Sequence, residues 1–458
     1  MTTPAPATCY TTAMPLPATT RLLVATAASA LLLAATDALA STDFVIAPYL
    51  QHLATNRVQV RFQVDEPAPA TVELRAPGAA GVRRYEDKGE SEFHDVTVDG
   101  LTAGTTYSYT VRVGERTTAP ATFTTAPADA AKPFTFLLAG DNRDDPDVYA
   151  DLVQWMLRIP SDFLVHTGDL VPRGSDLDAW EEYFRVAQPL LAQRCEFVAI
   201  GNHDLSGKGA KRREPFLQFF ASPDNPLAAY YTFRWGNSRF FVLDSQDTWE
   251  ADERPWLKER LESADTEEGI AHRIVVLHHS PFSTGMHGPD RGMRSAGILH
   301  MLLEHHVDLV LGGHDHMYER DQYGGIKYII SGGGGAPLYD VTPRATGRAY
   351  TSSIYHLVEV HVDGEKVSVT ARDTKGQAFD SAAYEATGPW MPTAPAPIAG
   401  AGQHGAVSVR PVPPRASSCG CSVPGTSSRS WAAAGIMGLL AWGLSRRARG
   451  SGRRGAHP

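Results

Sequence analysis

Two kinds of hydrophobic pattern divide the chain. In residues 57–64 (RVQVRFQV) hydrophobic and polar side chains alternate, and the alternation returns in residues 106–113 (TYSYTVRV). Side chains two apart in a strand lie on one face, so this period predicts half-buried β-strands. Turn residues separate these short strands, which predicts a small β-sandwich over residues 41–127. The stretch TTAPADAAKP then reads as a short linker.

Residues 133–385 follow a different rhythm. Brief hydrophobic runs end in polar residues: FTFLLAGD, DFLVHTGD, CEFVAIGNHD, RIVVLHHSP and VDLVLGGHDH. Between several of them, hydrophobic residues three and four apart predict helices, as in residues 176–192. Strands that alternate with helices predict an α/β fold in which helices cover both faces of a sheet. Ligands bind such sheets at the carboxyl ends of strands, and all five polar endings lie there.

The composition fits a globular protein and narrows its partners. With 43% hydrophobic and 20% charged residues, the 458-residue chain is typical neither of disordered nor of multi-span membrane proteins. A net charge of −9 without a basic stripe argues against nucleic acid as a partner.

Both ends have the character of processing segments. Residues 1–40 contain a short apolar run that leads to ALA at its end, which predicts a cleaved secretory signal. Residues 386–418 are rich in Pro, Ala and Gly, which predicts a linker. Residues 419–458 hold a Cys motif, an arginine cluster and an apolar run shorter than the roughly 20 residues that cross a bilayer. We expect a secreted, periplasmic or cell-surface anchored protein, with membrane contact only through this tail.

The polar strand endings carry the donor atoms of a metal site. His314 and His316 stand two apart in an extended segment, so both can face one cavity while Asp315 turns away. The other endings offer Asp141, Asp169, Asn202 with His203, and His278 with His279. Imidazole nitrogens and carboxylate oxygens suit zinc, iron and manganese. One ion would leave some of these groups unused, whereas a carboxylate can bridge two ions, so we expect a two-metal centre.

The ordered series GD, GD, GNHD, HHSP and GHDH resembles the motif set of the calcineurin-like metallophosphoesterases. GGHDHMYER and the leading β-sandwich resemble the purple acid phosphatase branch, and LTAGTTY resembles the tyrosine corner of fibronectin type III domains. The C-terminal tail is similar to a MYXO-CTERM-type sorting tail. The resemblance covers residues 43–380. It implies a metallophosphoesterase β-sandwich flanked by helices and preceded by a small all-β fibronectin III-like domain.

The resemblance also implies roles for the polar endings. Asp169 becomes the carboxylate that bridges two divalent or trivalent ions of Fe, Zn or Mn. The implied ligands are Asp141 and His316 for the first ion, and Asn202, His279 and His314 for the second. His279 is preferred to His278 because it completes the family's His-x-Pro, and its neighbour is expected to point into the opposite layer. His203 would be the general acid or a phosphate contact, with Asp204 orienting it.

Two positions depart from the family pattern. Arg143 stands where many members have a histidine ligand of the first ion, and Pro172 stands where the purple phosphatases have a tyrosine. The first ion therefore has one protein ligand fewer than in either pattern. Arg143 is either a phosphate contact, since guanidinium matches phosphate bidentately, or part of a structural salt bridge. His287, on a Gly-rich loop, is a further candidate for substrate contact.

These inferences predict an exported two-metal phosphoesterase. We expect it to hydrolyse a small phosphorylated substrate, a phosphate monoester, by attack of a metal-activated hydroxide. A phosphodiesterase on the same site is an alternative, because loops that shape the pocket decide that preference. A rival from another class is a non-catalytic surface binding protein with a degenerate hydrolase domain, an idea that Arg143 and Pro172 favour.

Overall fold

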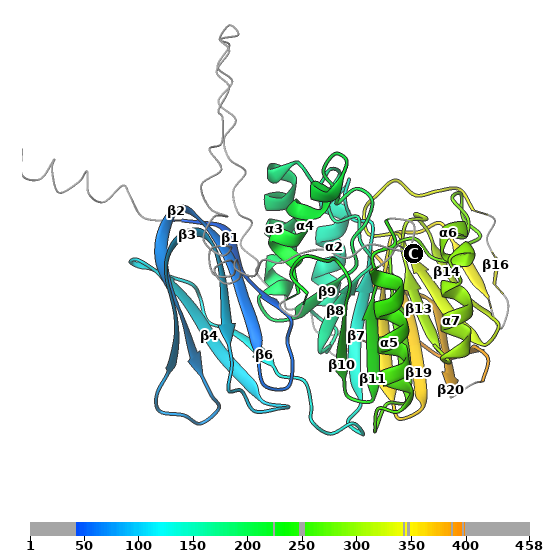
Figure 1. Cartoon of the computed structure of the whole chain (residues 1–458), viewed down its shortest axis with the longest axis horizontal. Helices are drawn as coiled ribbons and strands as arrows, with labels where there is room; N and C mark the ends of the chain where they lie inside the picture. The colour runs from blue at the N-terminus through cyan, green and yellow to red at the C-terminus, as the bar shows by residue number, and fades with distance from the viewer. Residues whose placement is uncertain are drawn as a thin grey trace, which may run out of the picture. The chain divides into compact units, whose positions relative to one another are not determined.

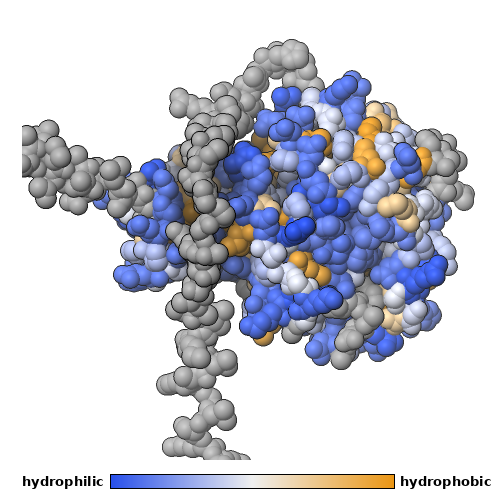
Figure 2. All heavy atoms as spheres, turned by 90° about the horizontal axis from the view of Figure 1, so that it is seen from above, coloured by the Kyte–Doolittle hydropathy of each residue, from blue (hydrophilic) through white to orange (hydrophobic). Residues whose placement is uncertain are grey.

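The structure is a computed structural model, and it describes only part of the chain. The described residues are 43–222, 225–246, 252–341, 344–345, 349–385, 388–395 and 398. The predicted signal segment and the predicted C-terminal tail lie outside them. No helix among the described residues is long and apolar enough to cross a membrane. The face of the molecule in Figure 2 is largely hydrophilic, with hydrophobic residues in small separate groups.

The first part of the described chain is all-β. Its strands are β1 (Phe44–Gln51), β2 (Val58–Arg75), β3 (Arg83–Val98), β4 (Thr106–Val113), β5 (Arg116–Thr117) and β6 (Ala121–Thr124). Strand β2 pairs antiparallel with β1, β3 and β4, and β4 also pairs with β5 and β6. The backbone N–H of Thr102 donates to the hydroxyl of Tyr107 at 2.9 Å, within the stretch that resembles a tyrosine corner.

Strand β2 differs in one respect from the half-buried strand that its alternation predicts. Val58, Val60 and Phe62 are buried as expected, but Arg61 on the other face is buried too. Its guanidinium donates to the Phe219 carbonyl at 2.9 Å, in the second part of the chain. The face of β2 expected to meet solvent therefore meets protein.

The second part contains two sheets. One has the order β21 (Met391–Pro392), β20 (Ala378–Glu385), β19 (Lys366–Asp373), β18 (His356–Asp363), β7 (Phe134–Ala139), β8 (Phe163–His166) and β9 (Cys195–Val198). The other has the order β10 (Tyr231–Trp235), β11 (Ser238–Val242), β12 (His272–Val276), β13 (Leu309–Gly312), β15 (Ile326–Ser331), β14 (Tyr318–Tyr323), β17 (Tyr350–Ser352) and β16 (Arg344–Ala345). Strands β7 to β9 run parallel, as do β11, β12, β13 and β15.

The alternation along these strands separates the cores. In β7, Phe136 and Leu138 join the core between the sheets, whereas Leu137 and Ala139 join an outer core under helices. That outer core includes α2 (Pro146–Met156), α3 (Leu177–Leu191) and α4 (Glu214–Phe220). The matching core on the other sheet includes α5 (Glu253–Asp265), α6 (Arg291–Ser295) and α7 (Ile298–Glu304) (Figure 1). The hydrophobic pattern alone suggested one sheet covered on both sides. Instead, two sheets share a core, and helices cover the outer face of each.

The second part of the chain extends further than the sequence suggested. The predicted linker begins at residue 386, yet β21 pairs with β20 beyond that point. Trp390 is fully buried, and its indole N–H donates to the Asp321 carbonyl at 3.0 Å. The predicted boundary is therefore too early. The Pro- and Gly-rich composition predicted a linker, but the buried Trp390 ties this segment to the fold.

Candidate metal centre

The polar endings lie just beyond the ends of neighbouring parallel strands. Strands β7, β8 and β9 lead to Asp141, Asp169 and Asn202, and β12 and β13 lead to His278, His279 and His314. The carboxyl ends of parallel strands meet at one edge of a sheet. The loops at these edges thus bring together groups that are far apart in the sequence.

Three candidate ligands have a left-handed backbone. The φ angles are 59° at Asp141, 57° at Asp169 and 71° at His314. Such conformations disfavour side chains with a Cβ and are concentrated at functional sites. The glycines beside them are required by close packing. A Cβ on Gly201 would lie 2.2 Å from the Asp169 nitrogen, and one on Gly313 would lie 2.5 Å from an Asp141 carboxylate oxygen.

The first ligand group combines Asp141, Asp169 and His316, whose ligand atoms lie within 4.8 Å of one another. All three residues are buried. His316 Nδ1 lies 2.7 Å from the Pro337 carbonyl, which can only accept, so Nδ1 carries the hydrogen and Nε2 faces the carboxylates. Burial and the neighbouring Asp169 raise the pKa of Asp141 well above its ordinary value. A bound cation would relieve this repulsion.

The second ligand group combines His278, His279 and His314 within the same 4.8 Å limit. His278 Nδ1 lies 2.8 Å from the Thr167 carbonyl, and His279 Nδ1 lies 2.8 Å from the Ser245 carbonyl. Both Nδ1 atoms therefore donate, which leaves each Nε2 lone pair free to bind a metal. Backbone partners of this kind fix the tautomer and orientation of ligating histidines.

The surroundings of His278 Nε2 fit a cation. It lies 3.1 Å from Asn202 Oδ1 and 3.5 Å from Asp169 Oδ1. Burial lowers the pKa of His278 well below its ordinary value, so the neutral ring presents a lone pair to other acceptors. The contact between His278 Nε2 and Asp169 Oδ1 does not depend on which end of the Asn202 amide carries the oxygen. A cation between these atoms would satisfy all of them.

The sequence interpretation of His278 is wrong. It was expected to point into the opposite layer, by the alternation of a strand. Strand β12 ends at Val276, so alternation does not extend to His278 and His279. Both rings face His314, at centroid distances of 5.0 and 4.2 Å. His278 therefore joins the candidate ligands.

Asp169 lies between the two groups. Its Oδ1 is 3.5 Å from His278 Nε2 and accepts from the His203 backbone N–H at 2.9 Å. Its Oδ2 is 3.4 Å from Arg143 Nε, on the side of the first group. One carboxylate thus presents an oxygen to each group, as a bridging ligand does.

Asp204 supports the backbone of this centre. Its buried carboxylate accepts from the N–H groups of Asp169 and Gly201 at 2.9 and 2.8 Å, and from those of Leu170 and Val171 at 2.8 and 3.3 Å. Burial and the negative charge of Asp169 raise the pKa of Asp204 to about 7, although the backbone hydrogen bonds act to lower it. The described hydrogen bonds of Asp204 do not include His203, which the sequence interpretation expected it to orient.

His203 is oriented instead by Pro172, whose carbonyl lies 2.9 Å from His203 Nδ1. A carbonyl accepts, so Nδ1 donates and Nε2 is left to face a ligand. The residue that replaces the tyrosine of the purple phosphatases thus holds the proposed general acid.

Arg143 lies beside the first ligand group, next to Asp169 and His316. Its side chain is 13% exposed and forms an ion pair with Asp144 as well as with Asp169. Its Nη2 is also 3.4 Å from His316 Nε2. The guanidinium therefore places positive charge against two of the three atoms expected to hold the first ion.

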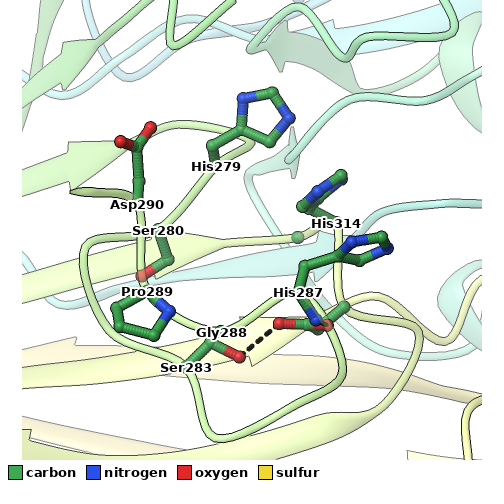
Figure 3. Close-up of a pocket in the computed structure, with 10 residues that line it drawn as sticks. His279, Ser280, Ser283, His287, Gly288, Pro289, Asp290 and His314 are labelled. Carbon is green, nitrogen blue, oxygen red and sulfur yellow. Dashed lines mark hydrogen bonds between the residues drawn. The ribbon is translucent and has the colours of Figure 1, made fainter. Parts of the chain in front are cut away.

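A pocket of about 170 Å³ opens beside the second group (Figure 3). Among its lining residues are His279, His287 and His314. The His287 ring stacks on His314, with centroids 4.2 Å apart and an interplanar angle of 28°. Asp315 turns away from the metal ligands, as expected, and accepts from the His287 backbone N–H at 2.8 Å and from the Ser283 hydroxyl.

Sequence reasoning missed Tyr339. Its ring stacks on His316, with centroids 4.2 Å apart and an interplanar angle of 21°. Its hydroxyl lies 3.1 Å from His287 Nε2. The one available signal was the preceding SGGGGAP, which reads as a tight turn. These glycines do not adopt positive φ; a Cβ on Gly334 would instead lie 2.4 Å from the Gly140 carbonyl oxygen, so the run permits close packing beside Asp141.

Comparisons with known proteins agree with this geometry. Residues 125–318 match the family of calcineurin-like phosphoesterases. Purple acid phosphatase 22 of Arabidopsis thaliana is 26% identical over 297 residues, which are 58% of this chain and 64% of the relative. The chain thus spans less than two thirds of that relative's length. Residues 125–318 are therefore similar to calcineurin-like phosphoesterases, and purple acid phosphatases are among the relatives of the chain.

Solved structures show the same fold. The purple acid phosphatase PPD1 of yellow lupin (Lupinus luteus) superposes with a TM-score of 0.63 at 17% identity, covering 74% of each chain. PhoD superposes with a TM-score of 0.63 at 13% identity, covering 79% of this chain and 94% of its own. The fold class is therefore that of a metallophosphoesterase.

Proposed function

We propose that this protein is an exported phosphoesterase that hydrolyses phosphate monoesters with the help of two metal ions. The observation that carries the proposal is the position of Asp169, one carboxylate shared by two ligand groups. Two neighbouring ions clamp the attacking and leaving oxygens of a phosphoryl group in known two-metal sites. The family uses a dinuclear centre, and Fe, Zn or Mn suits the donors present here.

The donor set assigns ligands to each ion. Asp141, Asp169 and His316 would hold the first ion. Asp169, Asn202, His279 and His314 would hold the second, with His278 as a further candidate ligand. When bound, the ions supply an activated water and neutralise the negative charge that develops on the phosphoryl group.

The remaining side chains of the site handle the substrate. The Pro172 carbonyl orients the His203 ring through Nδ1, and the imidazolium form of that ring gives its Nε2 proton to the leaving oxygen. Arg143, already beside Asp169, binds a phosphate oxygen. His287 lies over His314 and contacts the ester at the entrance of the pocket.

An assay of the purified chain tests this proposal. Metal content is measured together with release of p-nitrophenol from p-nitrophenyl phosphate, before and after chelation and metal reloading. We expect two equivalents of metal, and activity that disappears on chelation and returns on reloading. The bis(p-nitrophenyl) ester, run in parallel, should be the poorer substrate. If the diester is preferred, the monoester assignment is wrong. A protein that binds no metal and hydrolyses neither ester would instead fit the surface binding protein.

Export rests on residues 1–40, and surface attachment on residues 419–458, both known from sequence alone. We propose cleavage after Ala40 and membrane contact only through the tail. Mass spectrometry of the protein from fractionated cells tests this. A mature N-terminus near residue 41 in the periplasmic or surface fraction is expected, and an intact N-terminus in the cytoplasmic fraction would contradict export.

A further inference from the structure

Tyr339 contacts a residue of the first ligand group directly and reaches the second group through His287. Its ring stacks on His316 of the first group, while its hydroxyl lies 3.1 Å from His287. His287 in turn stacks on His314 of the second group. Contacts thus run from His316 through Tyr339 and His287 to His314, and so connect the two ligand groups.

We infer that Tyr339 is a positioning residue with two separable actions. Its ring holds the His316 imidazole in the orientation that binds the first ion. Its hydroxyl holds the His287 imidazole over His314, where the phosphate ester enters. The inference rests on the proposed function, because it assigns His287 to the substrate and His316 to an ion.

Three contacts link the segment of Tyr339 to His316. The Pro337 carbonyl accepts from His316 Nδ1 at 2.7 Å. The Tyr339 backbone N–H donates to the His316 carbonyl at 3.0 Å. The aromatic ring then covers one face of the imidazole. The carbonyl fixes the tautomer, but a single hydrogen bond leaves the ring free to tilt about it. The stacked ring prevents that tilt, so Nε2 stays directed at Asp141.

The hydroxyl acts on a different residue. The His287 side chain is exposed on a loop, between exposed Met286 and half-buried Gly288. Within the part of the chain that the structure describes, its ring forms one hydrogen bond, to the Tyr339 hydroxyl. An exposed imidazole without such a bond samples several rotamers on a nanosecond timescale. The hydroxyl therefore keeps His287 in the position that a substrate meets.

The glycine run explains how Tyr339 reaches this place. The Gly334 N–H donates to the Gly140 carbonyl at 2.9 Å, and the Ala336 N–H donates to the Asp141 carbonyl at 2.7 Å. A Cβ on Gly335 would lie 2.8 Å from the Asn142 carbonyl oxygen. The segment therefore follows the Asp141 loop closely and delivers Tyr339 to the outer side of His316.

Two substitutions separate the two actions. Tyr339→Phe keeps the ring and removes the hydroxyl, whereas Tyr339→Leu removes both. Tyr85→Phe is the matched control, because Tyr85 also loses one hydroxyl hydrogen bond, to the Asp99 carbonyl at 2.7 Å, in the N-terminal β-region. Each variant of the full chain is measured for metal loss to a chelator, for kcat and KM with p-nitrophenyl phosphate, and for binding of inorganic phosphate by calorimetry.

For Tyr339→Phe we expect metal retention like that of the unsubstituted protein, and phosphate affinity and KM that worsen by up to about tenfold, the effect of one hydrogen bond. For Tyr339→Leu we expect the same changes in phosphate affinity and KM. In addition, the protein should bind one metal ion about tenfold more weakly and lose it to the chelator, as for other partners of ligating histidines. Adding His287→Ala to Tyr339→Phe should weaken phosphate binding little further, because both act through one contact.

The outcomes separate the inference from the proposed function. Unchanged phosphate affinity in Tyr339→Phe overturns the action of the hydroxyl, and full metal retention in Tyr339→Leu overturns the action of the ring. An unsubstituted protein that binds two ions and phosphate but hydrolyses no ester would contradict the proposed function alone. In that case metal retention and phosphate binding still test Tyr339.

Discussion

The two ligand groups of the candidate centre differ in how the protein prepares them. In the second group, backbone carbonyls fix the rings of His278 and His279. Neither ring has an arginine or lysine among its described hydrogen bonds and ion pairs. In the first group, two buried carboxylates stand beside Arg143, which lies 3.4 Å from both Asp169 and His316. The second group therefore presents lone pairs that a cation would satisfy. The first group already has part of its charge balanced.

This difference has a consequence for metal binding. An ion that enters the first group must share its carboxylates with a guanidinium, whereas an ion in the second group meets imidazoles and one shared carboxylate. We therefore expect the first group to bind its ion more weakly, despite its higher negative charge. The family resemblance implies a histidine ligand where this chain has Arg143, and its absence would act in the same direction.

The largest effect is expected from Asp169→Asn. Both groups use this carboxylate, so both ions should be weakened, and activity should fall by at least about a hundredfold. Asp141→Asn is the matched comparison, because Asp141 belongs to the first group alone and should lower the metal content by one equivalent at most. Metal analysis after dialysis distinguishes them. If both variants lose the same number of ions, Asp169 is not shared.

A pair of histidine substitutions compares the groups directly. We expect His279→Ala to remove the tightly held ion and His316→Ala to remove the weakly held one, each with an affinity change of about 10- to 100-fold. Competition with a chromogenic chelator gives both affinities. If His316→Ala instead removes the tightly held ion, the proposed order of the two groups is reversed.

Arg143→Gln has two opposed effects. Removal of the guanidinium should tighten the first ion, because its competitor at Asp169 and His316 is gone. It should also raise KM by about tenfold, if the arginine binds the substrate phosphate as one charge-assisted contact. Metal titration and steady-state kinetics separate these effects. A variant that changes neither would leave Arg143 as a salt-bridge partner of Asp144.

Sequence patterns were informative where a local rule decides the geometry. The strand endings that bear Asp141, Asp169 and His314 follow from hydrophobic runs that stop at polar residues, and the structure brings these groups together. The rule failed at His278, since alternation was extended past the last residue of the strand. It also failed at Trp390, where one buried indole outweighs a composition typical of linkers.

Other parts of the site follow from long-range packing and leave no local trace. Tyr339 acquires its place through glycines that pack against the Asp141 loop, a contact between segments far apart in the sequence. Pro172 took over the orientation of His203 that was expected of Asp204, for a similar reason. The carboxylate next to His203 turned to backbone amides, and the carbonyl of a proline that lies 31 residues earlier took up the imidazole.

Asp204→Asn should have the smallest direct effect on the centre and act equally on both groups. The substituted side chain would present an amide nitrogen toward backbone N–H groups that now donate to a carboxylate, so at least one buried donor loses its partner. We expect the free energy of unfolding to fall by about 1 to 3 kcal/mol. Asp178→Asn, on the exposed first turn of α3, is the control and should stay within about 0.5 kcal/mol. Urea unfolding of the metal-free protein measures both.

Because Asp204 supports the Asp169 loop from which each group takes an oxygen, the two metal affinities should decline by the same factor. An unequal decline would show that the bridging loop serves one group more than the other.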